Sequence, residues 1–247
     1  MRQRKIKNLD EKLDELSRFS IEDGTELKGK WREVFGAAQT DDGHTELFAE
    51  FGCGKGKFLA GLAGIHPDKC YVAFEGNRSV VYHAMQKADE GDLKNVRYVT
   101  HYIDTASDFF DDGELDGIYL NFSDPWPKSK HEKRRLTAGT RLDDYIKAVR
   151  SGGTIEFRTD NDDLFDYTME KLMMASGIKI VAVTRDLHAE MEEIVKRIDM
   201  TELTDAGYDD DVLDALTTGS DLSVTSEYED RFSERGKNIN YVRVKVI

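Results

Sequence analysis

Short apolar runs alternate with amphipathic helical patterns along most of this chain, and that alternation limits the possible folds more than any other feature. Apolar segments of strand length predict strands at 46–51, 70–75, 96–102, 115–122, 154–159, 178–183 and 239–246. Helical periodicity predicts helices at 9–19, 57–64, 78–90, 138–150 and 161–175. Because strand–helix alternation makes successive strands parallel, we expect an α/β, doubly wound, mostly parallel seven-stranded sheet. The last two strands lack a convincing crossover helix, so the last strand should be antiparallel.

The length of 247 residues is enough for one large domain with a small appendage. We expect a basic, helical N-terminal extension at 1–40 and the main domain at 41–247, with an insertion at about 190–225. Within the insertion, residues 199–225 are rich in Thr, Asp and Gly, which predicts a loop. The basic side chains of the extension are Arg2, Arg4, Lys5 and Lys7.

Charge and composition exclude several classes of protein. The net charge of −14 has the wrong sign for a general nucleic-acid coat protein, so any RNA affinity must come from a local basic patch. The acidity would equally suit the proteome of a salt-adapted organism. No apolar run approaches the ~20 residues that cross a bilayer, so no membrane association is expected. Cys53 and Cys70 form no CxxC pair, which argues against a metal site and is typical of a cytoplasmic protein.

A glycine-rich turn follows the first predicted strand of the main domain. Gly52, Gly54 and Gly56 lie between Glu50 and the predicted helix at 57–64. Glycine lets a backbone turn sharply and approach a ligand closely, and ligands bind at the carboxyl ends of the strands in a doubly wound sheet. Taken alone, the same turn also suits a merely tight strand–helix connection.

Two acidic residues at the ends of later strands favour a nucleoside cofactor. Glu75 follows the glycine turn by about 20 residues, where a carboxylate accepts both ribose hydroxyls of an adenosine cofactor. The GxGxG spacing places Lys57 where the dinucleotide pattern GxGxxG needs its third glycine, so S-adenosylmethionine is favoured over NAD. Asp104 follows the strand at 96–102, within reach of an adenine amino group. Solvated carboxylates remain the alternative for both residues.

The segment from Asn121 to Arg135 carries most of the specificity. Asp124 lies between a strand end and Pro125, and Trp126 is followed by a run rich in Lys and Arg. Prolines restrict the backbone around Trp126, so Asp124 should be held at the mouth of the cofactor crevice. The basic run is of the kind that neutralises RNA phosphates, although an isolated run of this sort is usually a solvated loop.

The segment from Asn121 to Thr137 resembles the signature of the bacterial tRNA (guanine-N7)-methyltransferase family, NFPDPWPK followed by a basic stretch ending in KRRL. It is joined in order by the similar motifs EFGCGKG at 50–56, FRTDN at 157–161 and EYEDRF at 227–232. The resemblance covers roughly 45–185 and 226–246. It implies a Rossmann-like fold and S-adenosylmethionine-dependent methylation of guanine N7 in the variable loop of tRNA.

Carried over by position, the resemblance implies roles for individual residues. The implied cofactor contacts are Glu50, Gly52, Gly54, Gly56, Glu75, Asp104 and Asp124. The implied tRNA contacts are Lys128, Asp160, Ser226, Glu227, Tyr228 and Glu229. We expect tRNA as the partner and either a monomer or a homodimer.

Three departures from the family pattern affect the transfer of these residue roles to this chain. Ser123 stands where the family usually has proline, which loosens the backbone before Asp124. Ser226 replaces the usual threonine and keeps the hydroxyl. Residues of about 190–222 form a longer stretch than usual, so the alignment into the last motif is the least secure.

Guanine N7 carries an available lone pair, so its methylation needs no general base. Catalysis should depend on holding N7 in line with the methyl–sulfur bond and on stabilising the positive charge that the base acquires. Asp124 is the candidate catalytic residue for that stabilisation. Trp126 is expected either to stack on a base or to pack internally.

Three other function classes remain open. Exocyclic-amine methyltransferases carry two prolines after the same strand, where this chain has Ser-Asp-Pro-Trp, and they lack the downstream basic run. A non-catalytic tRNA-binding protein would not need Glu50, Glu75 and Asp124 together. A dehydrogenase is disfavoured by the glycine spacing.

Overall fold

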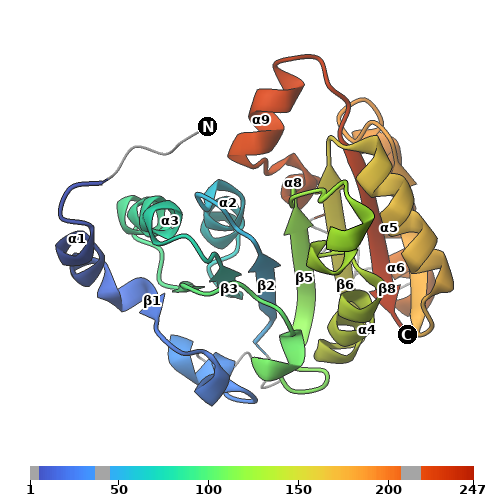
Figure 1. Ribbon diagram of the computed structural model, residues 1–247. Coiled ribbons are helices and arrows are strands. Elements are labelled where there is room, and N and C mark those ends of the chain that lie inside the picture. Colours follow the sequence, from blue (N-terminus) through green and yellow to red (C-terminus); the bar gives the residue numbers. More distant parts are fainter. Residues whose placement is uncertain (1–5, 37–44, 207–217) are drawn as a thin grey trace.

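A computed structural model describes residues 6–36, 45–206 and 218–247, and its centre is a single eight-stranded sheet (Figure 1). The strand order is β1-β4-β3-β2-β5-β6-β8-β7. The strands are β1 (Ser20–Ile21), β2 (Leu47–Phe51), β3 (Cys70–Phe74), β4 (Val96–Val99), β5 (Leu115–Asn121), β6 (Val149–Thr159), β7 (Ile178–Thr184) and β8 (Asn240–Val246).

The strand pairing confirms the mostly parallel sheet and its antiparallel last strand. β1 to β6 pair in parallel, whereas β8 lies between β6 and β7 and is antiparallel to both. The predicted number of seven strands is wrong, because β1 pairs with β4 and makes eight. β1 has only two residues, too few to show an alternating pattern in the sequence.

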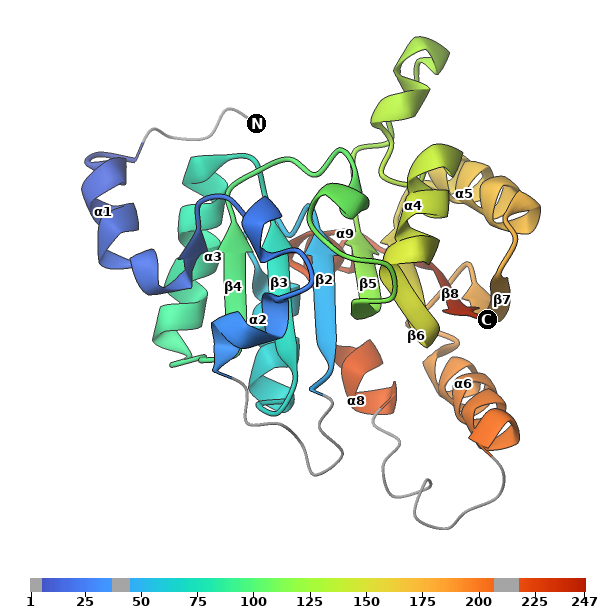
Figure 2. The same ribbon diagram turned by 90° about the horizontal axis from the view of Figure 1, so that it is seen from below.

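Helices cover the sheet on both faces (Figures 1 and 2). They are α1 (Leu9–Glu15), α2 (Lys57–Ile65), α3 (Arg78–Glu90), α4 (Gly139–Ala148), α5 (Asp162–Met174), α6 (Met191–Ala206), α8 (Thr218–Ser223) and α9 (Glu227–Ser233). Short 3-10 helices occur at Ser17–Phe19, Thr25–Leu27, Trp31–Phe35, Ala106–Asp108 and Ser129–Arg134.

Alternation along the strands divides the core between the two faces. Leu47 and Phe51 of β2 belong to the cluster that includes Phe165 of α5, whereas Phe48 belongs to the cluster that includes Phe58 of α2 and Val81 of α3. Successive side chains of a strand point to opposite faces, so these clusters lie on opposite sides of the sheet. The buried sheet is therefore a rigid platform for the loops at its carboxyl edge.

The N-terminal extension contributes to this platform. Trp31 is fully buried, and its indole N–H donates to the Phe109 carbonyl at 2.7 Å. β1, also within 1–40, adds to the edge of the sheet. The domain boundary near residue 40 stays a prediction, and Arg2, Arg4 and Lys5 lie outside the described residues.

The prediction of a loop over 199–225 is wrong for much of its length. α6 continues to Ala206 and α8 occupies Thr218–Ser223; residues 207–217 lie outside the described part of the chain. Ile194 and Ile198 of α6 are fully buried in a third cluster with Leu222 of α8 and Tyr241 of β8. The apolar face of α6 begins before residue 199, and the acidic residues of the helix hid it.

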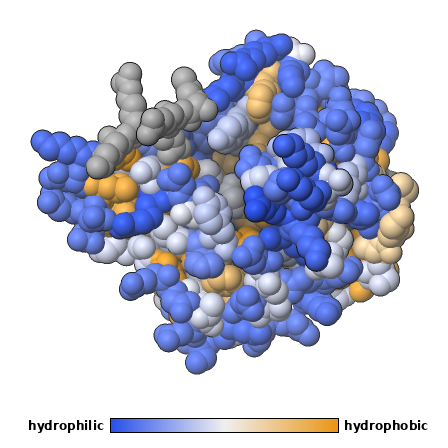
Figure 3. Space-filling model, in the orientation of Figure 1, coloured by the Kyte–Doolittle hydropathy of each residue, from blue (hydrophilic) through white to orange (hydrophobic). Residues whose placement is uncertain are grey.

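The surface is predominantly hydrophilic on the face drawn in Figure 3, with apolar patches of limited extent. Across the described residues no helix is long and apolar enough to span a membrane.

Candidate active site at the carboxyl edge of the sheet

The carboxyl ends of the parallel strands bring the predicted functional segments to one edge of the sheet. The glycine turn follows β2, Glu75 follows β3, Asp124 follows β5 and Asp160 follows β6. α9 adds the last motif, next to the glycine turn, although about 170 residues separate them in the sequence. In open α/β sheets this edge is where ligands bind.

The glycine turn has the geometry that glycine permits and other residues resist. Gly52, Gly54 and Gly56 have φ angles of 81°, 56° and 75°, all in the left-handed region. A Cβ at Gly56 would lie 2.6 Å from the Cβ of Ala84, so the turn packs directly against α3. The loop therefore follows the end of β2 closely and leaves its backbone open to a ligand.

Glu50 is a buried carboxylate with only one of its oxygens paired. Its side chain is 1% exposed, and Oε1 accepts a hydrogen bond from the Asn121 amide at 2.9 Å. Oε2 is buried and has no hydrogen-bond partner among the described residues. Burial raises the pKa of Glu50 to about 7, and the nearby Glu227 carboxylate adds to the shift. Such an oxygen fits a ligand that brings a hydrogen-bond donor or a positive charge.

Glu75, which follows β3, lies close enough to Glu50 for the two carboxylates to interact. Its Oε1 accepts from the Asn77 backbone N–H at 2.8 Å. Partial burial raises the pKa of Glu75, backbone N–H groups that include Gly54 oppose the rise, and the Asp124 carboxylate contributes to it. Glu75 and Asp124 thus lie close enough to interact, on either side of the glycine turn.

Asp104 does not join this group. Its side chain is 85% exposed and forms an ion pair with Arg141 at 2.9 Å. The predicted contact of Asp104 with a cofactor stays a prediction, and it would require Asp104 to turn away from Arg141.

The loop that carries Asp124 is held in an uncommon backbone conformation. Phe122 and Trp126 have positive φ angles of 50° and 40°, which cost energy in residues with a side chain. Arg135 compensates by donating to the carbonyls of Pro125 and Trp126 at 3.0 and 3.2 Å. An arginine ten residues downstream therefore fixes the loop together with the prolines, and Asp124 itself is exposed.

The basic segment after Asp124 forms an exposed projection. Arg134 places its guanidinium 4.9 Å from the Trp126 ring centroid, and His131 lies 5.6 Å from that ring. Lys128 and Lys130 are exposed. Trp126 is thus part of a cationic surface beside Asp124, not part of the core.

The last motif begins α9. Ser226 is the N-cap residue, and its hydroxyl accepts from the Glu229 backbone N–H at 3.1 Å. Tyr228 is 47% exposed and approaches Gly54, whereas Glu227 pairs with Lys87 at 2.9 Å. Asp160, partly buried after β6, pairs with Lys237 at 3.1 Å. Tyr228 therefore borders the glycine turn and Glu227 is linked to it through Lys87, whereas Ser226 is buried and its hydroxyl is used by the cap.

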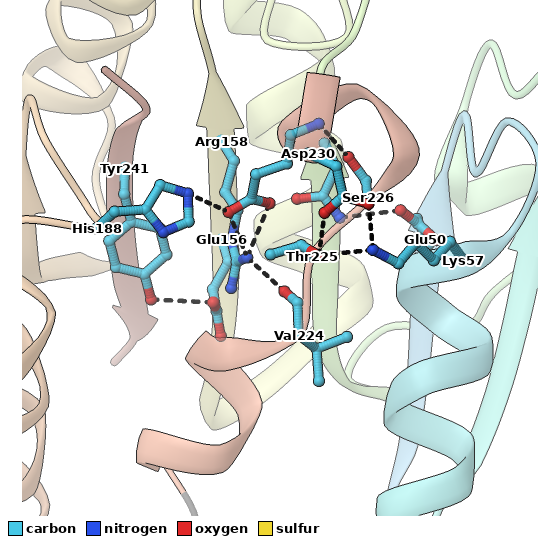
Figure 4. A network of polar contacts seen from close by, with 12 residues as sticks. Glu50, Lys57, Glu156, Arg158, His188, Val224, Thr225, Ser226, Asp230 and Tyr241 are labelled. Atoms are coloured by element: carbon cyan, nitrogen blue, oxygen red, sulfur yellow. Dashed lines mark hydrogen bonds and ion pairs between the residues drawn. The ribbon is translucent and has the colours of Figure 1, made fainter. Parts of the chain in front are cut away.

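Glu229 faces inward, unlike its neighbours. It is fully buried, and its carboxylate lies 3.2 Å from Arg158 of β6 and 3.2 Å from His188. Figure 4 labels Arg158 and His188. Burial alone would raise the pKa of Glu229, but His188 and Arg158 together hold it below its ordinary value. In this arrangement Glu229 is not available for the direct tRNA contact that the family resemblance implies; it anchors α9 to the sheet instead.

The sequence motifs did not single out Arg158 or His188 as residues of the candidate site. Arg158 is 1% exposed and also donates to the Val224 carbonyl at 2.8 Å. An arginine inside an apolar strand needs a buried anion as its partner. The position of Arg158 in the sequence could therefore have indicated a buried ion pair. His188 carried no local signal, because its partner is contributed by a distant helix.

Metal-binding geometry is absent from the part of the chain that the structure describes: no three His, Cys, Asp or Glu side chains there could hold an ion. Both cysteines are free thiols, and burial raises the pKa of Cys53, which makes it a poor nucleophile.

Comparison with known proteins points to the family that the sequence motifs resemble. Residues 44–241 match a family model described as putative methyltransferase. A tRNA (guanine-N(7)-)-methyltransferase of Lactococcus lactis subsp. cremoris is 37% identical over 247 residues, 100% of this chain and 99% of the relative. The enzyme of the same name from Bacillus subtilis is 39% identical over 188 residues, 76% of this chain and 85% of the relative.

Solved structures agree on the fold. An antibiotic-related methyltransferase has a TM-score of 0.54 at 18% identity, covering 90% of this chain and 92% of the other. The antibiotic-resistance methyltransferase Kmr has a TM-score of 0.52 at 14% identity, covering 92% and 95%. At these identities the likeness shows the Rossmann-like methyltransferase fold alone.

Proposed function

This chain belongs to the family of S-adenosylmethionine-dependent tRNA (guanine-N7)-methyltransferases, and we propose that it methylates a guanosine in the variable loop of tRNA at the carboxyl edge of its sheet. The observation that carries the assignment of the site is the meeting of Glu50, Glu75 and Asp124 around one glycine turn, next to an exposed basic projection.

The residues at the glycine turn fit S-adenosylmethionine. The unpaired Oε2 of Glu50 is a suitable acceptor for the ammonium group of the methionine moiety, and Glu75 is placed for the ribose hydroxyls. Gly52 and Gly54 leave the backbone accessible. When bound, the cofactor supplies a methyl group activated by a sulfonium.

Asp124 stabilises charge on the base. N7 already has a lone pair, so no residue needs to remove a proton. Asp124 is exposed at the mouth of the site, on a loop fixed by Arg135, where a carboxylate can accept hydrogen bonds from the guanine edge. Its contribution grows as the ring becomes cationic, so it favours the transition state over the ground state.

The tRNA backbone is bound by the basic projection. Lys128 and Lys130 are exposed beside the site, and Arg134 and Trp126 present a stacked cationic surface. Because the whole chain carries −14, these local cations must provide most of the attraction for phosphate. Ser226 and Tyr228 border the site from α9, and Asp160 borders it from β6.

The enzyme works in the cytoplasm, where its substrate is made. The free thiols of Cys53 and Cys70 are compatible with that reducing compartment.

The direct test is incubation of the protein with unmodified tRNA and methyl-labelled S-adenosylmethionine, followed by nucleoside analysis and mapping of the modified position. We expect 7-methylguanosine in the variable loop. Label on an exocyclic amine, or 7-methylguanosine only elsewhere in the tRNA, would refute the proposed specificity.

Asp124→Asn tests the catalytic role separately. We expect turnover at saturating substrates to fall by orders of magnitude while tRNA affinity changes little, since the interaction is made mainly in the transition state. Near-normal turnover would remove Asp124 from the mechanism.

Lys128→Ala/Lys130→Ala tests the RNA surface. The slope of log affinity against log salt should become shallower by roughly one to two, because each lost phosphate contact removes slightly less than one. An unchanged slope would mean that the projection is only a solvated loop.

A further inference from the structure

Two lysines join the glycine turn to the segment that carries the last motif. Lys57 is the first residue of α2 and directly follows Gly56. Its ammonium group donates to the Thr225 hydroxyl at 2.9 Å and forms an ion pair with Asp230 of α9 (Figure 4). The Thr225 hydroxyl also donates to Asp230 at 2.6 Å, so the three side chains form a closed group.

Lys87 makes the second connection from the last turn of α3. Its ammonium group donates to the Lys55 carbonyl, inside the glycine turn, at 2.9 Å. The same ammonium pairs with Glu227 of α9 at 2.9 Å. One side chain therefore holds both the backbone of the turn and the first residue of α9.

Close packing completes the joint. A Cβ placed on Gly54 would lie 3.7 Å from the Tyr228 ring, and one placed on Gly61 of α2 would lie 2.7 Å from Val224. Val224, Thr225, Tyr228 and Asp230 therefore contact the turn or α2. A displacement of the glycine turn cannot leave this segment unaffected.

The charges at the joint respond to the cofactor. The negative charges of Glu227 and Glu75 lie close enough to Glu50 to repel its ionised form, which raises the pKa of Glu50. The ammonium and sulfonium groups of S-adenosylmethionine are positive, so their arrival lowers this repulsion. Cofactor binding should therefore favour the position of α9 in which Glu227 stays near the turn.

We propose that Lys57 and Lys87 are positioning residues that latch α9 onto the glycine turn and thereby couple S-adenosylmethionine binding to tRNA binding. The inference rests on the proposed tRNA contact of Tyr228, the exposed residue of this segment. Coupling of this kind is reciprocal: if tRNA tightens cofactor binding by some factor, the cofactor tightens tRNA binding by the same factor.

A role limited to stability is a weak alternative for these lysines. The side chains of Lys57 and Lys87 are 38% and 33% exposed. Ion pairs with this degree of exposure contribute little to folding, because solvent screens them. Their removal should leave the fold intact and alter the relation between the two ligands.

The experiment measures the dissociation constant of sinefungin, a non-reacting cofactor analogue with an amine in place of the sulfonium, with and without saturating unmodified tRNA. The variants are Lys57→Met/Lys87→Met and, as a rescue, Lys57→Arg/Lys87→Arg. The matched control is Lys69→Met, which removes a lysine that pairs with Glu46 at 3.0 Å near the amino end of β3.

In the wild type we expect tRNA to tighten sinefungin binding by about 5- to 150-fold, the usual range for coupled sites. The methionine pair should bring that ratio to within about twofold of one, the arginine pair should restore part of it, and Lys69→Met should keep it. The reciprocal measurement, tRNA affinity with and without sinefungin, should give the same ratios.

Other results would overturn the latch. A wild-type ratio of one, or a methionine pair that keeps the wild-type ratio, contradicts it. A loss of thermal stability in the methionine pair that the Lys69→Met control does not show would assign these lysines to folding. Absence of tRNA binding by the wild type would instead refute the proposed function, so the two failures are distinguishable.

Discussion

Glu50 and Glu229 are two buried carboxylates at the same edge of the sheet, and their surroundings shift their pKa values in opposite directions. Glu50, on β2, has one amide partner and one unpaired oxygen, and burial raises its pKa to about 7. Glu229, on α9, is held by Arg158 and His188, which lower its pKa despite the burial. Burial is nearly equal in the two cases, so the partners decide the direction.

This difference in partners gives Glu229 a structural role and makes Glu50 the candidate for binding a ligand. The chain itself satisfies Glu229, which leaves that residue nothing to offer a ligand but lets it fix α9 in place. The chain leaves Glu50 half satisfied, and an unpaired buried oxygen is costly unless a ligand completes it. In the proposed cofactor contact, the stability lost at Glu50 would be recovered as binding free energy.

Arg158→Met should have the largest effect on this comparison. It leaves the carboxylate of Glu229 buried with His188 as its remaining charged partner, and breaking a buried ion pair costs about 3–5 kcal/mol. Urea unfolding at pH 7 measures the loss. Arg185→Met, which removes an ion pair with Asp166 whose side chains are 57% and 61% exposed, is the control and should change little. Equal effects of the two substitutions would mean that Glu229 does not need its internal partner.

Glu50→Gln should remove a pH dependence of stability. The pKa of Glu50 is raised from its ordinary value of 4.5 to about 7, so its contribution is present below pH 4.5 and is lost as the pH rises to about 7. The full change is roughly 3 kcal/mol. We expect unfolding of the cofactor-free protein to show this decline in the wild type and not in the variant. Parallel curves would place the pKa of Glu50 near its ordinary value.

The same substitution should weaken S-adenosylmethionine binding. A charge-assisted hydrogen bond to the cofactor contributes about 1.5–3 kcal/mol, so Glu50→Gln should raise the dissociation constant by about 10- to 150-fold at pH 8. In the wild type the affinity should increase as the pH rises through about 7, where Glu50 ionises. Calorimetry measures both. Wild-type affinity in a folded variant would show that the unpaired oxygen does not meet the cofactor.

His188→Gln should have the smallest effect, and that effect should be confined to the acidic side. The hydrogen bond to Glu229 raises the pKa of His188 above its ordinary 6.5. Its stabilisation is therefore complete below pH 6.5 and is lost as the pH rises through the raised pKa. We expect a loss of about 1 kcal/mol at pH 6, since the side chain is 33% exposed and solvent weakens the pair. The difference from wild type should shrink as the pH rises through the raised pKa of His188; a constant difference would indicate lost packing instead.

Periodicity and motifs in the sequence were enough to predict the mostly parallel sheet and its antiparallel last strand, and they pointed to segments that meet at its carboxyl edge. Each of these signals lies within a few to about fifteen consecutive residues, and the Asn121–Arg135 segment combines several of them. β1 and α6 were missed because the first is too short for a pattern and the second carries its apolar face in an acidic stretch.

Tertiary structure alone decided how the side chains at the site are used. Arg158 meets Glu229 across 71 positions in the chain, and Lys57 meets Asp230 across 173. The insertion of β8 between β6 and β7 and the return of α9 to the glycine turn create these contacts. A carboxylate's pKa depends on which charges and donors lie within a few ångströms of it, and no local pattern records that distance. For that reason the sequence proposed a set of acidic site residues, and only the fold distinguished Glu50, which has an unpaired oxygen, from Glu229, which has none.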